Sequence, residues 1–282
     1  MSETKAWAVT ALVLLSLLLA AGLALGAFGG PMLRRRAAAY ATRVGLPDAG
    51  RDPAFAARVG RRQRLVLAGV ALGVLATALT GGSVVLIWAG LAVGALADQL
   101  AAPAALGPSR VAHPAGTGLT DYVPAWLLVT VTAAAGCAPL LAPVWLVAPR
   151  APVSPASAAT PAIEVAGWVA IAAVGWAGSL LLARFLVGRR QRAASAADLA
   201  TDDAFRAQAV RDALHLTGAL SIAAAFGVSS ALQDDDVTGF ARHLGGWTPL
   251  VLLVAVAVVG TVHELTGGPR HWRRLYRVRQ PA

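Results

Sequence analysis

Residues 65–100 read LVLAGVALGVLATALTGGSVVLIWAGLAVGALADQL, an apolar run in which Asp98 is the one charged residue. As one straight helix, this run of about 36 residues would extend about 54 Å, whereas the hydrocarbon core of a bilayer is about 30 Å thick. The Gly-Gly-Ser sequence at 81–83 interrupts the run near its middle. The stretch therefore predicts two short membrane-spanning helices, 65–80 and 84–100, joined by a tight turn.

The composition of the whole chain indicates the same environment. Of the 282 residues, 57% are hydrophobic and 13% are charged, which is about half the charged fraction of an average soluble domain. Five further runs are apolar and long enough to cross a bilayer. They cover residues 7–28, 124–147, 162–187, 213–232 and 246–265. The sequence therefore predicts an all-α, polytopic integral membrane protein with seven transmembrane helices.

The basic residues predict the orientation of these helices. The chain has 24 Lys and Arg against 14 Asp and Glu, and its formal net charge is +10. With the N-terminus outside, every basic residue except Lys5, Arg150 and Arg242 falls on the cytoplasmic side, as the positive-inside rule requires. An even number of spans would place a basic cluster outside. We therefore expect the N-terminus out, the C-terminus in, and a multi-pass location in a bacterial plasma membrane, with no nucleic acid as partner.

Two segments of the chain resemble each other and suggest an internal repeat. RDPAFAARVGRRQR at 51–64 and TDDAFRAQAVRD at 201–212 each follow an arginine cluster and precede two apolar runs. The residues that align without a gap are Asp52 with Asp202, Ala54 with Ala204, Phe55 with Phe205, Ala57 with Ala207 and Arg61 with Arg211. Two three-helix repeats joined by one helix have the same orientation in the membrane, which makes the repeat parallel.

The resulting 3+1+3 arrangement divides the chain into three parts. The first repeat covers 1–110, the connecting helix and a Pro/Ala-rich outer loop cover 111–161, and the second repeat with its basic tail covers 162–282.

Each of the similar segments also predicts the start of a helix. Asp52 before Pro53 is a typical beginning, because the carboxylate accepts from free backbone N–H groups and proline has no N–H to leave unpaired. Thr201, Asp202 and Asp203 provide the same signal in the second copy. We expect both helices to begin in the cytoplasm and to project roughly 15 to 20 Å from the membrane.

Charged residues near the ends of the predicted spans are candidates for a gate or an ion pair, because charges within a membrane are costly and often functional. They are Asp98, Arg184, His263 and Glu264. The alternative is that these groups only mark the water interface, which long side chains reach easily.

The two projecting helices also have an apolar and basic stripe that is suited to docking a partner. The candidate docking residues are Phe55, Arg58, Arg61, Phe205 and Arg211.

Glycines four residues apart, at 22 and 26, 69 and 73, and 90 and 94, predict close helix packing, within the chain or between two copies. Pro139 and Pro143 predict a kink in the connecting helix.

The sequence contains no recognisable set of catalytic, metal-binding or cofactor-binding residues. The His-Glu pair at 263–264 lacks the second histidine of a zinc-binding helix, because Gly267 occupies that position. We therefore expect a protein that is not an enzyme and has no cofactor.

The favoured function is a non-catalytic subunit or accessory protein of a membrane complex, in contact with the bilayer, with anionic lipids at its cytoplasmic face and with another membrane protein. The alternative is a small-solute or lipid transporter with its site at the repeat interface.

Overall fold

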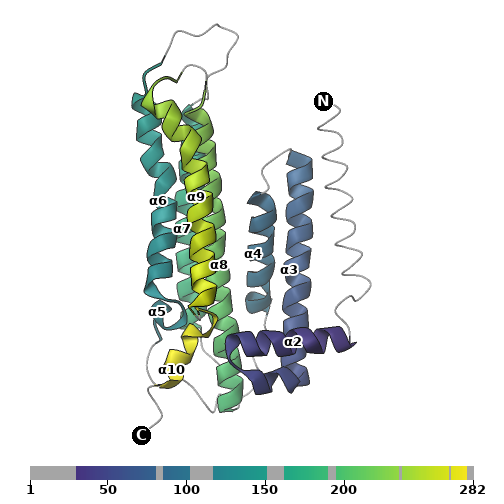
Figure 1. Cartoon of the computed structure of the whole chain (residues 1–282). Helices are drawn as coiled ribbons and strands as arrows, with labels where there is room; N and C mark the ends of the chain where they lie inside the picture. The colour runs from purple at the N-terminus through teal and green to yellow at the C-terminus, as the bar shows by residue number, and fades with distance from the viewer. Residues whose placement is uncertain are drawn as a thin grey trace. The chain divides into compact units, whose positions relative to one another are not determined.

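The computed structural model describes residues 30–80, 85–101, 117–150, 162–189, 195–234, 237–266 and 268–277. In these residues the chain is helical, without strands, apart from one isolated bridge between Arg150 and Val237. The longer helices are α2 (Gly30–Val44), α3 (Pro53–Thr80), α4 (Val85–Ala101), α6 (Ala125–Val147), α7 (Ala162–Gly188), α8 (Ala196–Ala231) and α9 (Phe240–Leu265) (Figure 1). The short ones are η1 (Pro47–Arg51), α5 (Leu119–Tyr122), η2 (Gly268–Arg273) and α10 (Arg274–Arg277).

The length and apolar composition of several helices are those of membrane-spanning helices. Three of the described helices, α6, α7 and α8, are long and apolar enough to cross a bilayer. Six of the seven predicted runs correspond to helices, and the run at 7–28 lies outside the described residues. Helix α6 continues through Pro139 and Pro143, so the predicted kink does not interrupt it.

The two predicted helix starts have different outcomes. Helix α3 begins at Pro53, and the Asp52 carboxylate accepts a hydrogen bond from the Ala54 N–H at 2.8 Å, which confirms the first prediction. The second prediction is wrong, because α8 begins at Ala196, several residues before Thr201. Ser195 caps this helix: its hydroxyl accepts from the Asp198 N–H at 3.1 Å and donates to the Asp198 carboxylate.

The predicted hairpin at 65–100 is confirmed as two helices whose backbones are in close contact. A Cβ added to Gly69 would lie 2.0 Å from the Gly90 carbonyl oxygen, and one added to Gly90 would lie 2.1 Å from the Gly69 oxygen. A Cβ added to Gly73 would lie 2.3 Å from the Leu86 carbonyl oxygen, and one added to Gly94 would lie 2.2 Å from the Leu65 carbonyl oxygen. The small-residue pattern of these four glycines therefore serves packing within the chain. Glycines 22 and 26 lie outside the described residues.

The chain divides into two compact units. Unit 1 comprises Met1–Pro124, Leu182–Ala213 and Gly267–Ala282, and unit 2 comprises Ala125–Leu181 and Leu214–Thr266. The division falls inside α7 and inside α8. Each unit thus combines segments that are distant in the sequence, and the predicted division at 110 and 161 stays a prediction.

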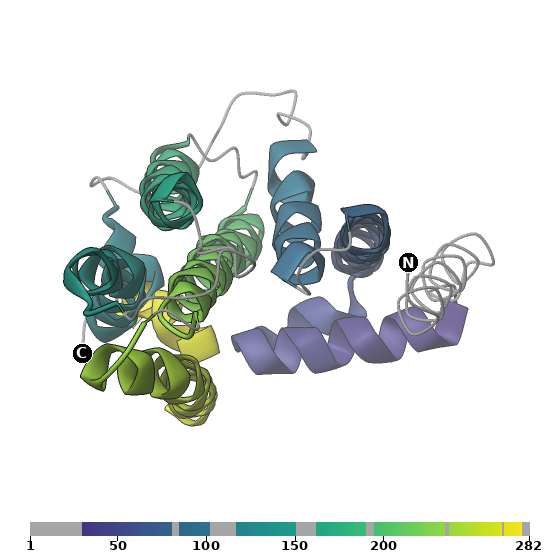
Figure 2. The same ribbon diagram turned by 90° about the horizontal axis from the view of Figure 1, so that it is seen from above.

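Unit 2 is a bundle of α6, α9 and the parts of α7 and α8 within it (Figure 2). Small residues make the centre of this bundle: Ala138 of α6, Ala172 of α7 and Ala224 of α8 are fully buried. A Cβ on Gly227 would lie 2.2 Å from the Trp168 ring, so the indole lies directly against the backbone of α8. Exposed Val and Leu side chains on the outside of α6, α7 and α9 fit a surrounding of lipid.

Unit 1 contains a helix that the sequence analysis missed. Helix α2 lies across α3 in both views (Figures 1 and 2). Ala37, Ala41 and Val44 are fully buried on one side of α2, at the spacing of a helix face. The helix ends at Val44. Gly45 follows with a φ of 85°, which suits glycine, and the Leu46 N–H donates to the Ala41 carbonyl at 2.7 Å.

Candidate functional site

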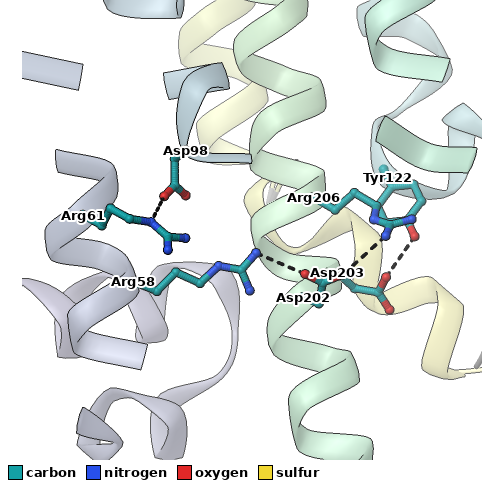
Figure 3. A network of polar contacts seen from close by, with 7 residues as sticks. All are labelled: Arg58, Arg61, Asp98, Tyr122, Asp202, Asp203 and Arg206. Atoms are coloured by element: carbon teal, nitrogen blue, oxygen red, sulfur yellow. Dashed lines mark hydrogen bonds and ion pairs between the residues drawn. The ribbon is translucent and has the colours of Figure 1, made fainter. Parts of the chain in front are cut away.

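The charged side chains of unit 1 form a cluster that joins α3, α4, α5 and α8, hereafter the charged cluster (Figure 3). It consists of Arg58, Arg61 and Arg62 of α3, Asp98 of α4, Tyr122 of α5, and Asp202, Asp203, Arg206, Gln208, Arg211 and Asp212 of α8. The helices place these groups because residues three, four or seven apart share one face of a helix.

Three ion pairs connect α3 to its neighbours. The Arg58 Nη2 atom lies 3.1 Å from Asp202 Oδ1, and the Arg61 Nε atom lies 2.7 Å from Asp98 Oδ1. Arg62 pairs with Asp212. Charge-assisted hydrogen bonds of this kind are roughly twice as strong as neutral ones, so together they hold the beginning of α3 against α4 and α8.

The Arg61–Asp98 pair is the most asymmetric of the three. The Asp98 side chain is fully buried, whereas 36% of the Arg61 side chain is exposed. The second carboxylate oxygen, Asp98 Oδ2, is buried and has no hydrogen-bond partner among the described residues. A buried carboxylate is costly unless it is paired, so the pairing with Arg61 offsets the free-energy cost of burying Asp98 at the end of α4.

Three aromatic rings lie beside the ion pairs. The centroids of Phe55 and Phe205 are 5.5 Å apart, and the Tyr40 ring lies 5.5 Å from Phe205 and 6.1 Å from Phe55. The Arg58 guanidinium stacks over Phe205, 4.2 Å from the ring centroid. Phe55 is 2% exposed and Phe205 is fully buried, so these rings contact each other inside unit 1. A separate protein that docked on them would first have to open this cluster, and their docking role stays a prediction.

The contacts between α3 and α8 connect positions that are aligned in the sequence repeat. Phe55 aligns with Phe205, and continuing the alignment without a gap brings Arg62 opposite Asp212. The two contacts are seven residues apart along each helix, the spacing at which parallel helices repeat their contacts. These segments of α3 and α8 therefore run side by side in the same direction.

Other contacts fix α5 and the end of α7. The Tyr122 hydroxyl donates to Asp203 Oδ1 at 2.9 Å, and both side chains are fully buried. Burial, with the neighbouring Asp203 carboxylate, raises the pKa of the Tyr122 phenol. Arg206 donates to the Val187 carbonyl at 2.8 Å, which satisfies a free carbonyl at the C-terminal end of α7.

Arg211, another of the predicted docking residues, is 2% exposed. Its Nη2 atom donates to Gln208 Oε1 at 2.7 Å, and the Gln208 amide donates to Asp212 Oδ1 at 2.9 Å. Since Arg62 also binds Asp212, these residues extend the network along α8. Their burial indicates that the network is part of the interior of unit 1.

Tyr40 of α2 completes the aromatic side of the cluster. Its hydroxyl is buried and has no hydrogen-bond partner in the described part of the chain. Burial raises the pKa of the phenol, although Arg62 and Arg211 act in the opposite direction. The ring is therefore held by its packing on Phe55 and Phe205 and not by its hydroxyl.

The structure does not bring the four candidate gate residues together within the residues it describes. Asp98 pairs with Arg61, which the sequence analysis had considered for docking. Arg184 is exposed on α7. The side chains of His263 and Glu264 lie outside the described residues, so the gate stays a prediction.

Sequence reasoning missed Tyr40, Arg62, Tyr122, Arg206 and Asp212. Arg62 and Asp212 had a detectable signal, because each lies seven residues after the phenylalanine of its segment and the two charges are opposite. Tyr40 and Tyr122 had none, since their partners follow in the sequence only after many residues.

No group of three or more His, Cys, Asp or Glu side chains in the described ranges could hold a metal ion. Comparison with protein families, with curated proteins and with solved structures gives no match. The charged cluster, as described, can hold helix ends together and can bury charge. Both are structural capabilities.

Proposed function

We propose that the chain is a multi-pass protein of a bacterial plasma membrane that acts as a non-catalytic subunit or accessory protein of a membrane complex. In this proposal it has seven spans in two parallel repeats, with the N-terminus outside and the C-terminus inside. The distribution of its basic residues supports the orientation. The contacts of Phe55 with Phe205 and of Arg62 with Asp212, at aligned positions, support the repeat.

The observation that carries the accessory role is the low burial of α7. In its most apolar 18-residue stretch, 17% is buried, whereas the corresponding stretch of α8 is 56% buried. Val174 is 71% exposed and Leu181 is 66% exposed on this helix. Within unit 2, α7 thus presents an exposed apolar face, and in this proposal a second membrane protein covers part of it.

The charged cluster supports the same proposal. Its carboxylates Asp98, Asp202 and Asp212 each pair with an arginine of α3. Groups used in this way stabilise the ends of the helices, as a rigid scaffold for another protein requires, and they are less suited to act as acids or bases.

The experiment is gentle extraction of the tagged protein from its native membrane, followed by mass spectrometry of the proteins that accompany it. Val174→Trp on α7 and Leu140→Trp on α6 are a matched pair, since the two side chains are 71% and 74% exposed. We expect a stoichiometric partner with wild type and with L140W, and a clear loss of it with V174W. Extraction of the chain alone, or equal recovery with both variants, would contradict the proposal.

The second candidate function is a transporter, and the fully buried Asp98 favours it. Its Oδ2 atom has no partner among the described residues, and ionisable groups buried within a span often mark ion and substrate pathways. Asp98→Asn would then abolish solute uptake or lipid exchange in liposomes. Unchanged transport by D98N would remove this residue as the reason for the assignment.

A further inference from the structure

Helix α2 has three consecutive arginines, Arg34, Arg35 and Arg36, and all three are exposed. The opposite side of the helix, with Ala37 and Ala41, is buried in unit 1. Consecutive residues of an α-helix are about 100° apart, so three of them cover about 200° of its circumference. The arginines therefore present positive charge outward and on both flanks of α2, whichever flank faces a membrane.

The direction of α2 suits a position at a membrane surface. The helix lies across α3 in both views (Figures 1 and 2). If α3 crosses the bilayer, as the proposed topology requires, α2 lies parallel to the plane of the bilayer. This step, and the inference as a whole, rests on the proposed function in that respect.

The level of α2 along α3 agrees with the depth of lipid headgroups. A Cβ on Gly60 would lie 3.1 Å from Leu33 Cδ1, so the first turn of α2 lies beside Gly60. The apolar run of α3 begins five positions later, at Leu65, which corresponds to about 7.5 Å along the helix. The headgroup region adds about 5 to 7 Å on each side of the hydrocarbon core. Arg34 and Arg35 thus lie within reach of lipid phosphates.

The helix is held firmly at the other end. Arg270 of η2 donates to the Thr42 and Arg43 carbonyls at 3.1 and 3.3 Å, which ties the end of α2 to η2. Tyr40 packs on Phe55 and Phe205. Because these contacts fix α2, its arginines are already placed before any lipid binds, and little conformational entropy is lost on binding.

We propose that α2 is a membrane-surface helix whose arginines 34, 35 and 36 bind the phosphate groups of anionic lipids at the inner leaflet. The complementary charge and the depth of the helix carry this assignment. Arg51 is also an exposed arginine of unit 1, and it lacks that depth. Arg51, which ends η1, is adjacent to the start of α3 at Pro53, about 18 Å before Leu65 along the helix. At that distance, physiological salt screens most of the attraction to the membrane.

The test uses the full-length protein, delipidated in detergent and then supplied with phosphatidylglycerol or phosphatidylcholine, with bound lipid counted by native mass spectrometry. Wild type should retain phosphatidylglycerol in preference to phosphatidylcholine. Arg35→Gln should weaken the retention of phosphatidylglycerol about fivefold, the effect of one arginine near a lipid surface, and the triple variant R34Q/R35Q/R36Q should weaken it by about two orders of magnitude. The matched control Arg51→Gln should retain wild-type binding.

Three results of this lipid-binding test would overturn the inference. One is equal retention of both lipids by wild type, and another is the same loss in R51Q as in R35Q. Displacement of phosphatidylglycerol by millimolar inorganic phosphate would also do so, because the site would then recognise the free anion and not the lipid.

A parallel measurement separates this inference from the proposed topology. Resistance of each variant to alkaline extraction from membranes reports insertion, independently of headgroup binding. Wild type that is removed by alkali would refute the membrane topology itself. Inserted variants that keep full preference for phosphatidylglycerol would refute only the role of α2.

Discussion

Replacement of Gly69 by alanine tests whether the close contact between α3 and α4 determines the stability of this hairpin. The new Cβ would lie 2.0 Å from the Gly90 carbonyl oxygen, whereas carbon and oxygen atoms in close helix contacts are about 3.3 Å apart. The oxygen belongs to the backbone, so no side chain can rotate away. The two helices would have to separate by about 1.3 Å at this level.

The expected cost follows from two opposing effects. Overpacking of a well-packed site typically destabilises by about 1 to 3 kcal/mol, and a gap of about 1 Å along the rest of the interface also weakens its dispersion contacts. Alanine is favoured over glycine in a helix by about 0.5 to 1 kcal/mol. We therefore expect Gly69→Ala to lower the free energy of unfolding by about 2 kcal/mol.

Gly218 of α8 provides the matched control, because nothing lies within 4 Å of a Cβ added there. Gly218→Ala retains the gain in helix propensity without the clash and should raise the free energy of unfolding by about 0.5 kcal/mol or more. Both variants would be unfolded with sodium dodecyl sulfate in mixed micelles and followed by circular dichroism. If G69A were as stable as G218A, the close backbone contact would not exist as described, and the argument from the glycines would be refuted.

Three further predictions concern the charged cluster and the C-terminal segment. Arg61→Gln should destabilise the protein by about 3 kcal/mol in chemical unfolding, since it leaves the buried Asp98 unpaired. Adding Asp98→Asn should restore much of the lost stability. An R61Q protein of wild-type stability would contradict the ion pair. Tyr122→Phe should lower the free energy of unfolding by about 1 kcal/mol because it removes the hydrogen bond to Asp203. Tyr40→Phe should leave it unchanged, because the Tyr40 hydroxyl has no partner in the described residues. Equal effects of the two variants would be inconsistent with these contacts. Burial lowers the pKa of His271, whose Nε2 atom lies 2.9 Å from the Thr120 carbonyl. The contribution of this group to stability should therefore be present above the unfolded pKa of about 6.5 and be lost as the pH falls below it. Hydrogen exchange of residues 268–277 should become faster at pH 5.5 than at pH 7.5 in wild type but not in His271→Gln.

The local features of the fold were predictable from the residues themselves. The interruption of residues 65–100 by Gly-Gly-Ser and the position of Asp52 before Pro53 correctly predicted a helical hairpin and the start of α3. The spacing of Gly69, Gly73, Gly90 and Gly94 predicted a close contact. These signals are local, because turn chemistry, capping and residue size act between neighbouring residues or across one helix face.

Other features were not predictable because a stronger local signal competed. Thr201 and Asp202 resembled a helix start, yet α8 begins at Ala196, where the Ser195 hydroxyl and Asp198 cap the helix reciprocally. Once the helix has begun, acidic residues within it gain partners elsewhere: Asp202 pairs with Arg58. An acidic residue in the sequence can therefore be a cap or an ion-pair partner, and only its surroundings distinguish the two.

The sequence by itself determined that the chain is helical and apolar enough for a membrane, because composition and periodicity depend on each segment alone. The tertiary structure alone decided what the charged and aromatic residues contact. Phe55 and Phe205 are about 150 positions apart in the chain and yet lie 5.5 Å apart, and Asp98 is paired by Arg61 across the hairpin. The physical reason is that burial and pairing depend on which faces of distant helices meet, and that choice is made by the packing of the whole unit.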